Sequence, residues 1–99
     1  MHTHTVFFWL RNDVNIEGRA AFQNGLDRLT REPHVLERRI GAPAQTRRDV
    51  VDSTFDYAIV LKFADLGAHD AYQVSEAHQG FLDDCLGMID RVQVYDVAH

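Results

Sequence analysis

Tyr72, Glu76 and His78 lie close together in the segment DAYQVSEAHQGF, residues 70–81. A histidine with an ordinary pKa of about 6.5 is largely neutral at pH 7 and accepts a proton, whereas a tyrosine, with a pKa of about 10, stays protonated and donates a hydrogen bond. Such a pair suits the removal of an acidic C–H proton and the stabilisation of the enolate that forms. A carboxylate at Glu76 could orient the imidazole, but we assign it no role.

A structural explanation of the same residues requires no chemistry. Tyr72 could cover the core with its hydroxyl in water, and His78 could make one backbone hydrogen bond in the first turn of a short helix. His4 lies in an apolar strand, where burying a histidine is costly unless it is hydrogen-bonded, so we expect a polar partner. His2 shares its strand face and could join it at a transition metal. Because no third ligand has diagnostic spacing, no metal or other cofactor is predicted. No role is assigned to the histidines at expected element ends, His34, His69 and His99.

The composition is that of an ordinary folded domain of 99 residues, 45% hydrophobic and 25% charged. A formal net charge of −5 argues against a nucleic-acid-binding surface. We interpret the arginine pairs at 38–39 and 47–48 as solvated residues of strand ends and loops, with binding of an anionic ligand as the alternative. The single cysteine, Cys85, is interpreted as a structural thiol whose pKa is raised by its acidic neighbours. No stretch approaches the ~20 apolar residues of a membrane span, and we expect a cytoplasmic protein.

Strand and helix patterns alternate along the chain. The predicted strands are rich in β-branched and aromatic residues and cover 3–11, 34–41, 55–63 and 91–97. The predicted helices cover 15–32, 65–72 and 75–82. Asn15 is the expected N-cap of the first helix and Pro33 its terminator, while Ser75 is expected to cap the third. The apolar stripe of the first helix comprises Ile16, Ala20, Phe22, Leu26 and Leu29.

The order βαββαβ, with right-handed crossovers, predicts an α+β fold of the ferredoxin-like type. In that fold a four-stranded antiparallel sheet carries its helices on one face, and the 55–63 strand should be central. The other face would expose Phe7, Trp9, Val60 and Tyr95, an apolar patch that soluble monomers rarely tolerate. We therefore expect a homodimer in which two such sheets pack face to face into a dimeric α/β barrel.

With this topology in place, three stretches resemble the stress-responsive dimeric α/β-barrel family, or Dabb. They are HTVFFWLR at 4–11, YAIVLKFADLGAHDAYQ at 57–73, and AHQGFLD at 77–83 with VYDV near the end of the chain. The resemblance covers nearly the whole chain as a single domain, residues 1–99, and the spacing of Tyr72 and His78 is among its more specific features. It implies a small-molecule pocket between sheet and helices. From the predicted strand and helix faces, its lining would be Val6, Phe8, Phe22, Leu26, Tyr57, Ile59, Phe81, Val92 and Val94.

Within that family, the chain resembles plant polyketide cyclases of the olivetolic acid cyclase type, which close a ring by an intramolecular aldol reaction without a metal or cofactor. The resemblance implies that His78 is the base, Tyr72 the oxyanion donor and His4 an orienting group, acting on a polyketide-like or β-dicarbonyl compound. The chain departs from the family at Glu76, where proline is common, and from the plant cyclase at Tyr57, where that enzyme has histidine. The alternatives are a non-catalytic ligand-binding or stress-protective dimer and a cofactor-free monooxygenase-like protein.

Overall fold

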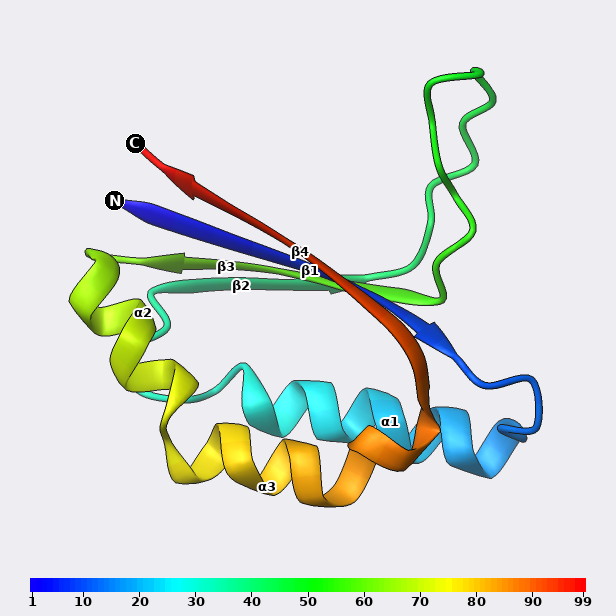
Figure 1. Cartoon of the computed structure of the whole chain (residues 1–99), viewed down its shortest axis with the longest axis horizontal. Helices are drawn as coiled ribbons and strands as arrows, with labels where there is room; N and C mark the ends of the chain where they lie inside the picture. Colours follow the sequence, from blue (N-terminus) through cyan, green and yellow to red (C-terminus); the bar gives the residue numbers. More distant parts are fainter.

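A single antiparallel sheet with helices on one face forms the molecule (Figure 1). The computed structural model describes residues 1–99. Its elements are β1 (His2–Leu10), α1 (Ile16–Leu29), β2 (Glu37–Gly41), β3 (Tyr57–Phe63), α2 (Leu66–Gln73), α3 (Glu76–Cys85), the short 3₁₀ helix η1 (Leu86–Met88) and β4 (Ile89–Ala98). The strand order is β2-β3-β1-β4, so the predicted ferredoxin-like topology and the central position of β3 are confirmed.

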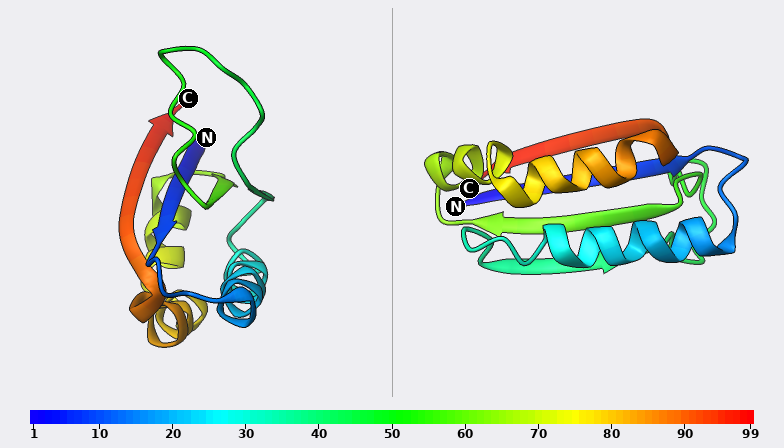
Figure 2. Two further views of the ribbon diagram at one scale, coloured as in Figure 1. Left: turned by 90° about the vertical axis from the view of Figure 1, so that its right-hand side faces the viewer. Right: turned by 90° about the horizontal axis from the view of Figure 1, so that it is seen from below.

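Strand β1 lies between β3 and β4, and its side chains alternate between buried and half-buried. This alternation follows from the pleat, which turns successive side chains to opposite faces. His2, His4, Val6, Phe8 and Leu10 face the helices and are buried. Seen from the helix side, α1 lies over β2 and β3, whereas α3 lies over β1 and β4 (Figure 2).

Helices α1 and α3 begin at the capping residues predicted from the sequence, Asn15 and Ser75. The side chain of Asn15 accepts a hydrogen bond from the Gly18 N–H at 2.8 Å, which satisfies one free donor of the first turn of α1. The structure corrects two details of this helix. It ends at Leu29, before Pro33. Ile16, predicted on the buried stripe, is 84% exposed because the first turn of α1 extends past the ends of the strands.

The hydrophobic core lies between the sheet and the helices. Burying each large apolar side chain there contributes about 1.5–3 kcal/mol relative to leaving it exposed. The core consists of Val6, Phe8, Leu10, Phe22, Leu26, Leu29, Ile59, Leu61, Phe63, Tyr72, Phe81 and Cys85. As predicted for a structural thiol, the Cys85 pKa is raised, first by burial and then by Asp84.

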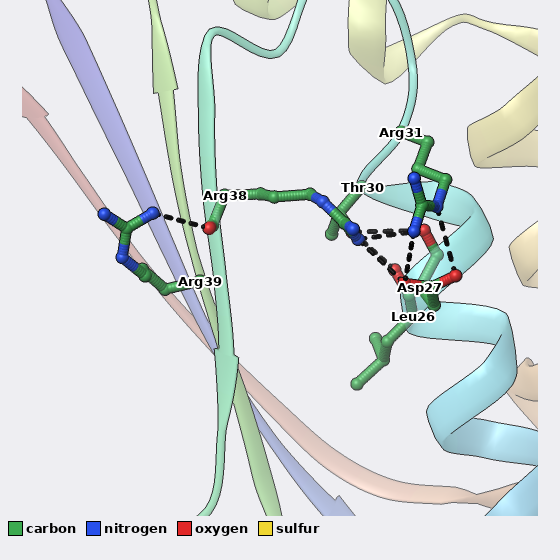
Figure 3. A network of polar contacts seen from close by, with 6 residues as sticks. All are labelled: Leu26, Asp27, Thr30, Arg31, Arg38 and Arg39. Carbon is green, nitrogen blue, oxygen red and sulfur yellow. Dashed lines mark hydrogen bonds and ion pairs between the residues drawn. The ribbon is translucent and has the colours of Figure 1, made fainter.

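Arg38 joins β2 to the end of α1 (Figure 3). Its Nη1 donates to Asp27 Oδ1 at 2.9 Å and to Thr30 Oγ1 at 3.0 Å. Arg31 also donates to the Asp27 carboxylate, and the two guanidinium groups hold the pKa of Asp27 below its usual range. Arg38 is therefore a half-buried structural residue, which corrects its interpretation as a solvated strand-end residue. The neighbouring Arg39 is on the opposite face of the strand and bonds only to a backbone carbonyl.

The sheet face opposite the helices is covered only by part of the 42–56 connection. Phe55 packs edge-on against Phe7, with ring centroids 4.9 Å apart, and lies 6.4 Å from the Trp9 ring. Val60 and Tyr95 remain exposed on this face. We call it the open face below. None of the helices is long and apolar enough to cross a bilayer.

Candidate functional site

The turn between α2 and α3 places Tyr72 beside His78. Ser75 Oγ donates to the carbonyl of Tyr72 at 2.7 Å and accepts from the backbone N–H of His78 at 3.1 Å, which confirms Ser75 as the cap of α3. The two rings meet edge to face, with centroids 5.4 Å apart and planes at 83°. The structure thus brings the predicted base and donor together, and the His78 imidazole has no hydrogen bond within the chain.

The ring of Tyr72 is in the core, but its hydroxyl is not bonded there. The residue is only 1% exposed, and its ring centroid lies 5.1 Å from that of Phe63 and 6.0 Å from that of His4. The hydroxyl makes no hydrogen bond within the chain, although no fully enclosed polar side-chain atom lacks a partner. It therefore borders accessible space. Burial, together with the nearby Glu32 charge, raises the pKa of Tyr72, so the hydroxyl remains a proton donor at neutral pH.

His78 is partly buried, and its surroundings favour the neutral imidazole. Burial lowers the pKa of His78 below 6.5, and the nearby imidazoles of His4 and His69 lower it further. At pH 7 the ring therefore carries a lone pair that can accept a proton.

His4 has the polar partner that its position on the core face of β1 requires. Cross-strand pairing sets His4 opposite Asp96 of β4, and His4 Nδ1 lies 2.6 Å from Asp96 Oδ1. An ionised carboxylate can only accept, so Nδ1 donates and Nε2 keeps a lone pair. Burial lowers the pKa of His4, and the Asp96 carboxylate offsets this only in part. Burial alone would raise the pKa of Asp96, but the hydrogen bonds from His4 and His2 hold it below its usual range.

Two further imidazoles gather at the same carboxylate. His2 Nε2 lies 2.9 Å from Asp96 Oδ1, and His69 Nε2 lies 3.8 Å from it. His69, which has no role predicted from the sequence, thus joins His2 and His4 beside Asp96, a grouping that no ligand spacing in the sequence indicated. Two signals were available: Asp96 shares a predicted strand face with Val94, and His69 precedes Tyr72 by three residues, which places both on one helix face.

Glu76 does not contact the imidazole it was suggested to orient. It is exposed in the first turn of α3 and forms no hydrogen bond or ion pair with His78. A carboxylate in this position interacts favourably with the helix dipole. The structure therefore gives Glu76 a local role in the helix.

The apolar residues predicted to line a pocket fall into two groups. Six of them belong to the closely packed core, namely Val6, Phe8, Phe22, Leu26, Ile59 and Phe81, and Tyr57 packs at its margin. Val92 and Val94 are instead 43% and 38% exposed, because they lie on the edge strand β4 where the helices leave part of its inner face uncovered. Val92 and Val94 are therefore the two exposed residues of the predicted lining.

The main hollows of the surface lie away from His4, Tyr72 and His78. One of about 170 Å³ lies between α1 and α3, around Gly25 and Phe81. Another of about 120 Å³ lies on the open face, between Trp9 and Tyr95. The remaining ones follow polar loops. None of these five hollows is lined by Tyr72 or His78, and the larger enclosed pocket remains a prediction.

Solved structures share this fold. A protein from Arabidopsis thaliana matches with a TM-score of 0.82 and 18% identity, over 100% of this chain and 95% of its own. A dimeric ferredoxin-like protein of unknown function from Thermobifida fusca has a TM-score of 0.80 and 18% identity, over 99% and 90%. The hydroxynitrile lyase from Passiflora edulis has a TM-score of 0.80 and 15% identity, over 97% and 90%. At these identities the likeness shows the fold alone. No curated protein sequence matches the chain.

The profile of the Stress responsive A/B Barrel Domain, Dabb, matches residues 3–99. This span includes all of the sheet except His2, and both helices that carry Tyr72 and His78. The chain therefore belongs to the Dabb family of stress-responsive A/B barrel domains.

Proposed function

We propose that this protein is a cofactor-independent enzyme that makes or breaks a carbon–carbon bond next to a carbonyl group by proton transfer. An intramolecular aldol closure of a polyketide-like or β-dicarbonyl compound is the reaction we favour. The observation that carries the proposal is the Tyr72–His78 pair, a neutral imidazole in edge contact with a phenol whose hydroxyl is unbonded. The shared fold of a hydroxynitrile lyase supports lyase chemistry by analogy only.

In this reaction each of the two groups has one task. His78 removes a proton from the carbon between two carbonyls, and the Tyr72 hydroxyl donates a hydrogen bond to the enolate or alkoxide oxygen that forms. A positioned base accelerates proton transfer by about 10²- to 10⁴-fold, which is sufficient only for an already acidic C–H bond. The substrates are therefore activated by adjacent carbonyl groups.

His4 acts in this proposal as an orienting group. Its Nδ1 is held by Asp96, so the ring is fixed in one tautomer with the Nε2 lone pair free. The exposed Val92 and Val94 continue from Asp96 along the inner face of β4 and offer an apolar surface for the substrate chain.

The catalytic proposal is tested with a panel of linear poly-β-keto thioester analogues, with ring-closed products followed by absorbance and mass spectrometry. We expect His78→Asn to reduce turnover by about 10²- to 10⁴-fold. His99→Asn is the matched control, because His99 is an exposed imidazole that pairs with Thr3 Oγ1 on the open face of the sheet. Unchanged turnover in His78→Asn would refute the assignment.

The same panel separates the alternative functions. Ligands that bind wild type and His78→Asn equally, without conversion, would identify a non-catalytic binding or stress-protective dimer. Oxygen consumption during turnover would identify a monooxygenase-like protein, because an aldol closure consumes no oxygen.

We also propose that the protein is a homodimer joined through the open face. The exposed Val60 and Tyr95, beside half-buried Phe7 and Trp9, form an apolar surface on this face. The dimeric description of the Thermobifida fusca relative supports the proposal. Light scattering after gel filtration should give a dimer mass for wild type and a monomer mass for Val60→Asp. Ile16→Asp, an exposed apolar site on the helix side, should remain dimeric. A monomeric wild type at micromolar concentration would contradict the proposal.

A further inference from the structure

Three imidazoles and one carboxylate converge at the end of the sheet where the two chain termini meet (Figure 1). His2 and His4 come from β1, Asp96 from β4 and His69 from α2. One ligand atom of each residue lies within 4.8 Å of the other three. We propose that this cluster binds a divalent transition metal ion, with Zn²⁺ as the preferred ion.

The separations suit a four-coordinate ion. Asp96 Oδ1 lies 2.6 Å from His4 Nδ1, 2.9 Å from His2 Nε2 and 3.8 Å from His69 Nε2. Ligand atoms bound tetrahedrally to zinc at about 2.0–2.1 Å are about 3.3 Å apart. The observed distances lie on both sides of that value, so small side-chain rotations would complete the site.

The position of the proton on the His69 ring also favours a bound cation. Its Nδ1 lies 3.1 Å from Asp70 Oδ1, and a carboxylate only accepts, so in the neutral ring Nδ1 carries the proton and Nε2 the lone pair. Gln73 Nε2 donates a long hydrogen bond of 3.5 Å to that lone pair, and Asp96 Oδ1 lies 3.8 Å from the same nitrogen. The His69 side chain is 9% exposed. The Nε2 atom of the buried His69 thus faces the carboxylate oxygen of the exposed Asp96, and a cation between these two atoms would be coordinated by both.

The surrounding groups indicate which ion would bind. Three neutral imidazoles with one carboxylate suit Zn²⁺ and its neighbours in the transition series, whereas Mg²⁺ and Ca²⁺ prefer oxygen ligands throughout. Asp70 would accept a hydrogen bond from His69 Nδ1 and so orient the ring, as carboxylates commonly do for histidines that bind zinc. The ion would bind the first and last strands to α2.

The metal site and the proposed reaction share His4 and Asp96, and at a metal the proton on His4 Nδ1 would move to Nε2 so that Nδ1 could coordinate. Neither His78 nor Tyr72 supplies a ligand, and metal binding is measured without any substrate. Failure of the metal proposal would leave the Tyr72–His78 proposal in place, and the reverse also holds.

Titration calorimetry tests the site, with ZnCl₂ added to the full chain after removal of metals by a chelator. We expect one Zn²⁺ per chain for wild type and for the control His34→Gln, and affinity lower by at least about 100-fold for His69→Gln. Co²⁺ should give the visible absorption of a four-coordinate site in wild type and lose it in His69→Gln. Absence of stoichiometric Zn²⁺ binding by wild type, or equal affinity of His69→Gln, would overturn the proposal.

A second variant keeps the test decisive if His69→Gln fails to fold. Asp70 is exposed, so Asp70→Asn removes the carboxylate that accepts from His69 Nδ1 with little effect on folding. Its affinity for Zn²⁺ should be lower by about 10- to 100-fold. An affinity equal to that of wild type would count against the site. Tyr72→Phe and His78→Asn should bind Zn²⁺ as wild type does.

Discussion

Removing the Tyr72 hydroxyl should separate function from stability. The hydroxyl has no hydrogen-bond partner within the chain, so Tyr72→Phe breaks no bond and keeps the ring in place. We expect the free energy of unfolding to change by less than about 0.5 kcal/mol. Turnover, in contrast, should fall by about 10²- to 10³-fold, as when one donor to a developing oxyanion is lost.

Removal of the whole Tyr72 side chain should, in contrast, destabilise the fold. Tyr72 is 1% exposed and packs 5.1 Å from the Phe63 centroid and 5.4 Å from that of His78. Tyr72→Ala should therefore lower the free energy of unfolding by about 3–5 kcal/mol through the cavity it leaves. In a domain of this size each 1 kcal/mol corresponds to about 4–8 °C in the midpoint of thermal unfolding.

The assay is urea unfolding followed by circular dichroism, in chelator-containing buffer near pH 7 and at one protein concentration. Wild type, Tyr72→Phe and Tyr72→Ala are compared, together with turnover of any substrate found in the panel. If Tyr72→Phe lost more than about 1 kcal/mol, the hydroxyl would be a structural hydrogen-bonding group and the reasoning would fail. Full activity in Tyr72→Phe would refute its role as donor.

Further predictions concern packing and pH. A Cβ at Gly25 of α1 would lie 2.7 Å from the buried Sγ of Cys85. Overpacking at this contact should lower the free energy of unfolding by about 1–3 kcal/mol, whereas the better helix propensity of alanine should raise it by at most about 1 kcal/mol. Gly25→Ala should therefore lower the urea midpoint. Gly80→Ala, with nothing within 4 Å, should raise the midpoint, and equal effects would contradict this packing. Burial and two neighbouring imidazoles lower the pKa of His78 in the folded chain. The folded state therefore favours the neutral ring, and the resulting stabilisation is complete above about pH 6.5, the pKa in the unfolded chain, and is lost as the pH falls below it. The urea midpoint should therefore drop more between about pH 7.5 and 5.5 for wild type than for His78→Gln; equal drops would show that this imidazole is not buried.

Local patterns were sufficient for most of the architecture. The alternation in β1 predicted which side chains face the helices, because the pleat gives every strand a period of two. Asn15 and Ser75 were recognisable as caps, since a side-chain oxygen beside the free N–H groups of a first turn needs only neighbouring residues. The boundaries were less predictable: α1 ends before Pro33 because its last turn is closed by Thr30.

Local spacing predicted only the part of the candidate site whose residues are near in sequence, and His4 was included through the family resemblance. Tyr72 and His78 are joined by one turn, so their spacing alone brought them together. His4 and Asp96 are 92 positions apart and meet through the register of β1 and β4, and His69 joins them only because α2 packs against that end of the sheet.

The chain by itself therefore specified the order of its elements, the faces of its strands and the need of a buried His4 for a partner, because these follow from periodicity and from the cost of burying a polar group. The identity of that partner, the gathering of three imidazoles around it, and the packing of predicted pocket residues such as Phe22 and Leu26 into a closed core came from the folded structure. These features depend on strand register and on how side chains fill the space between layers, and neither is encoded in the pattern of any single segment.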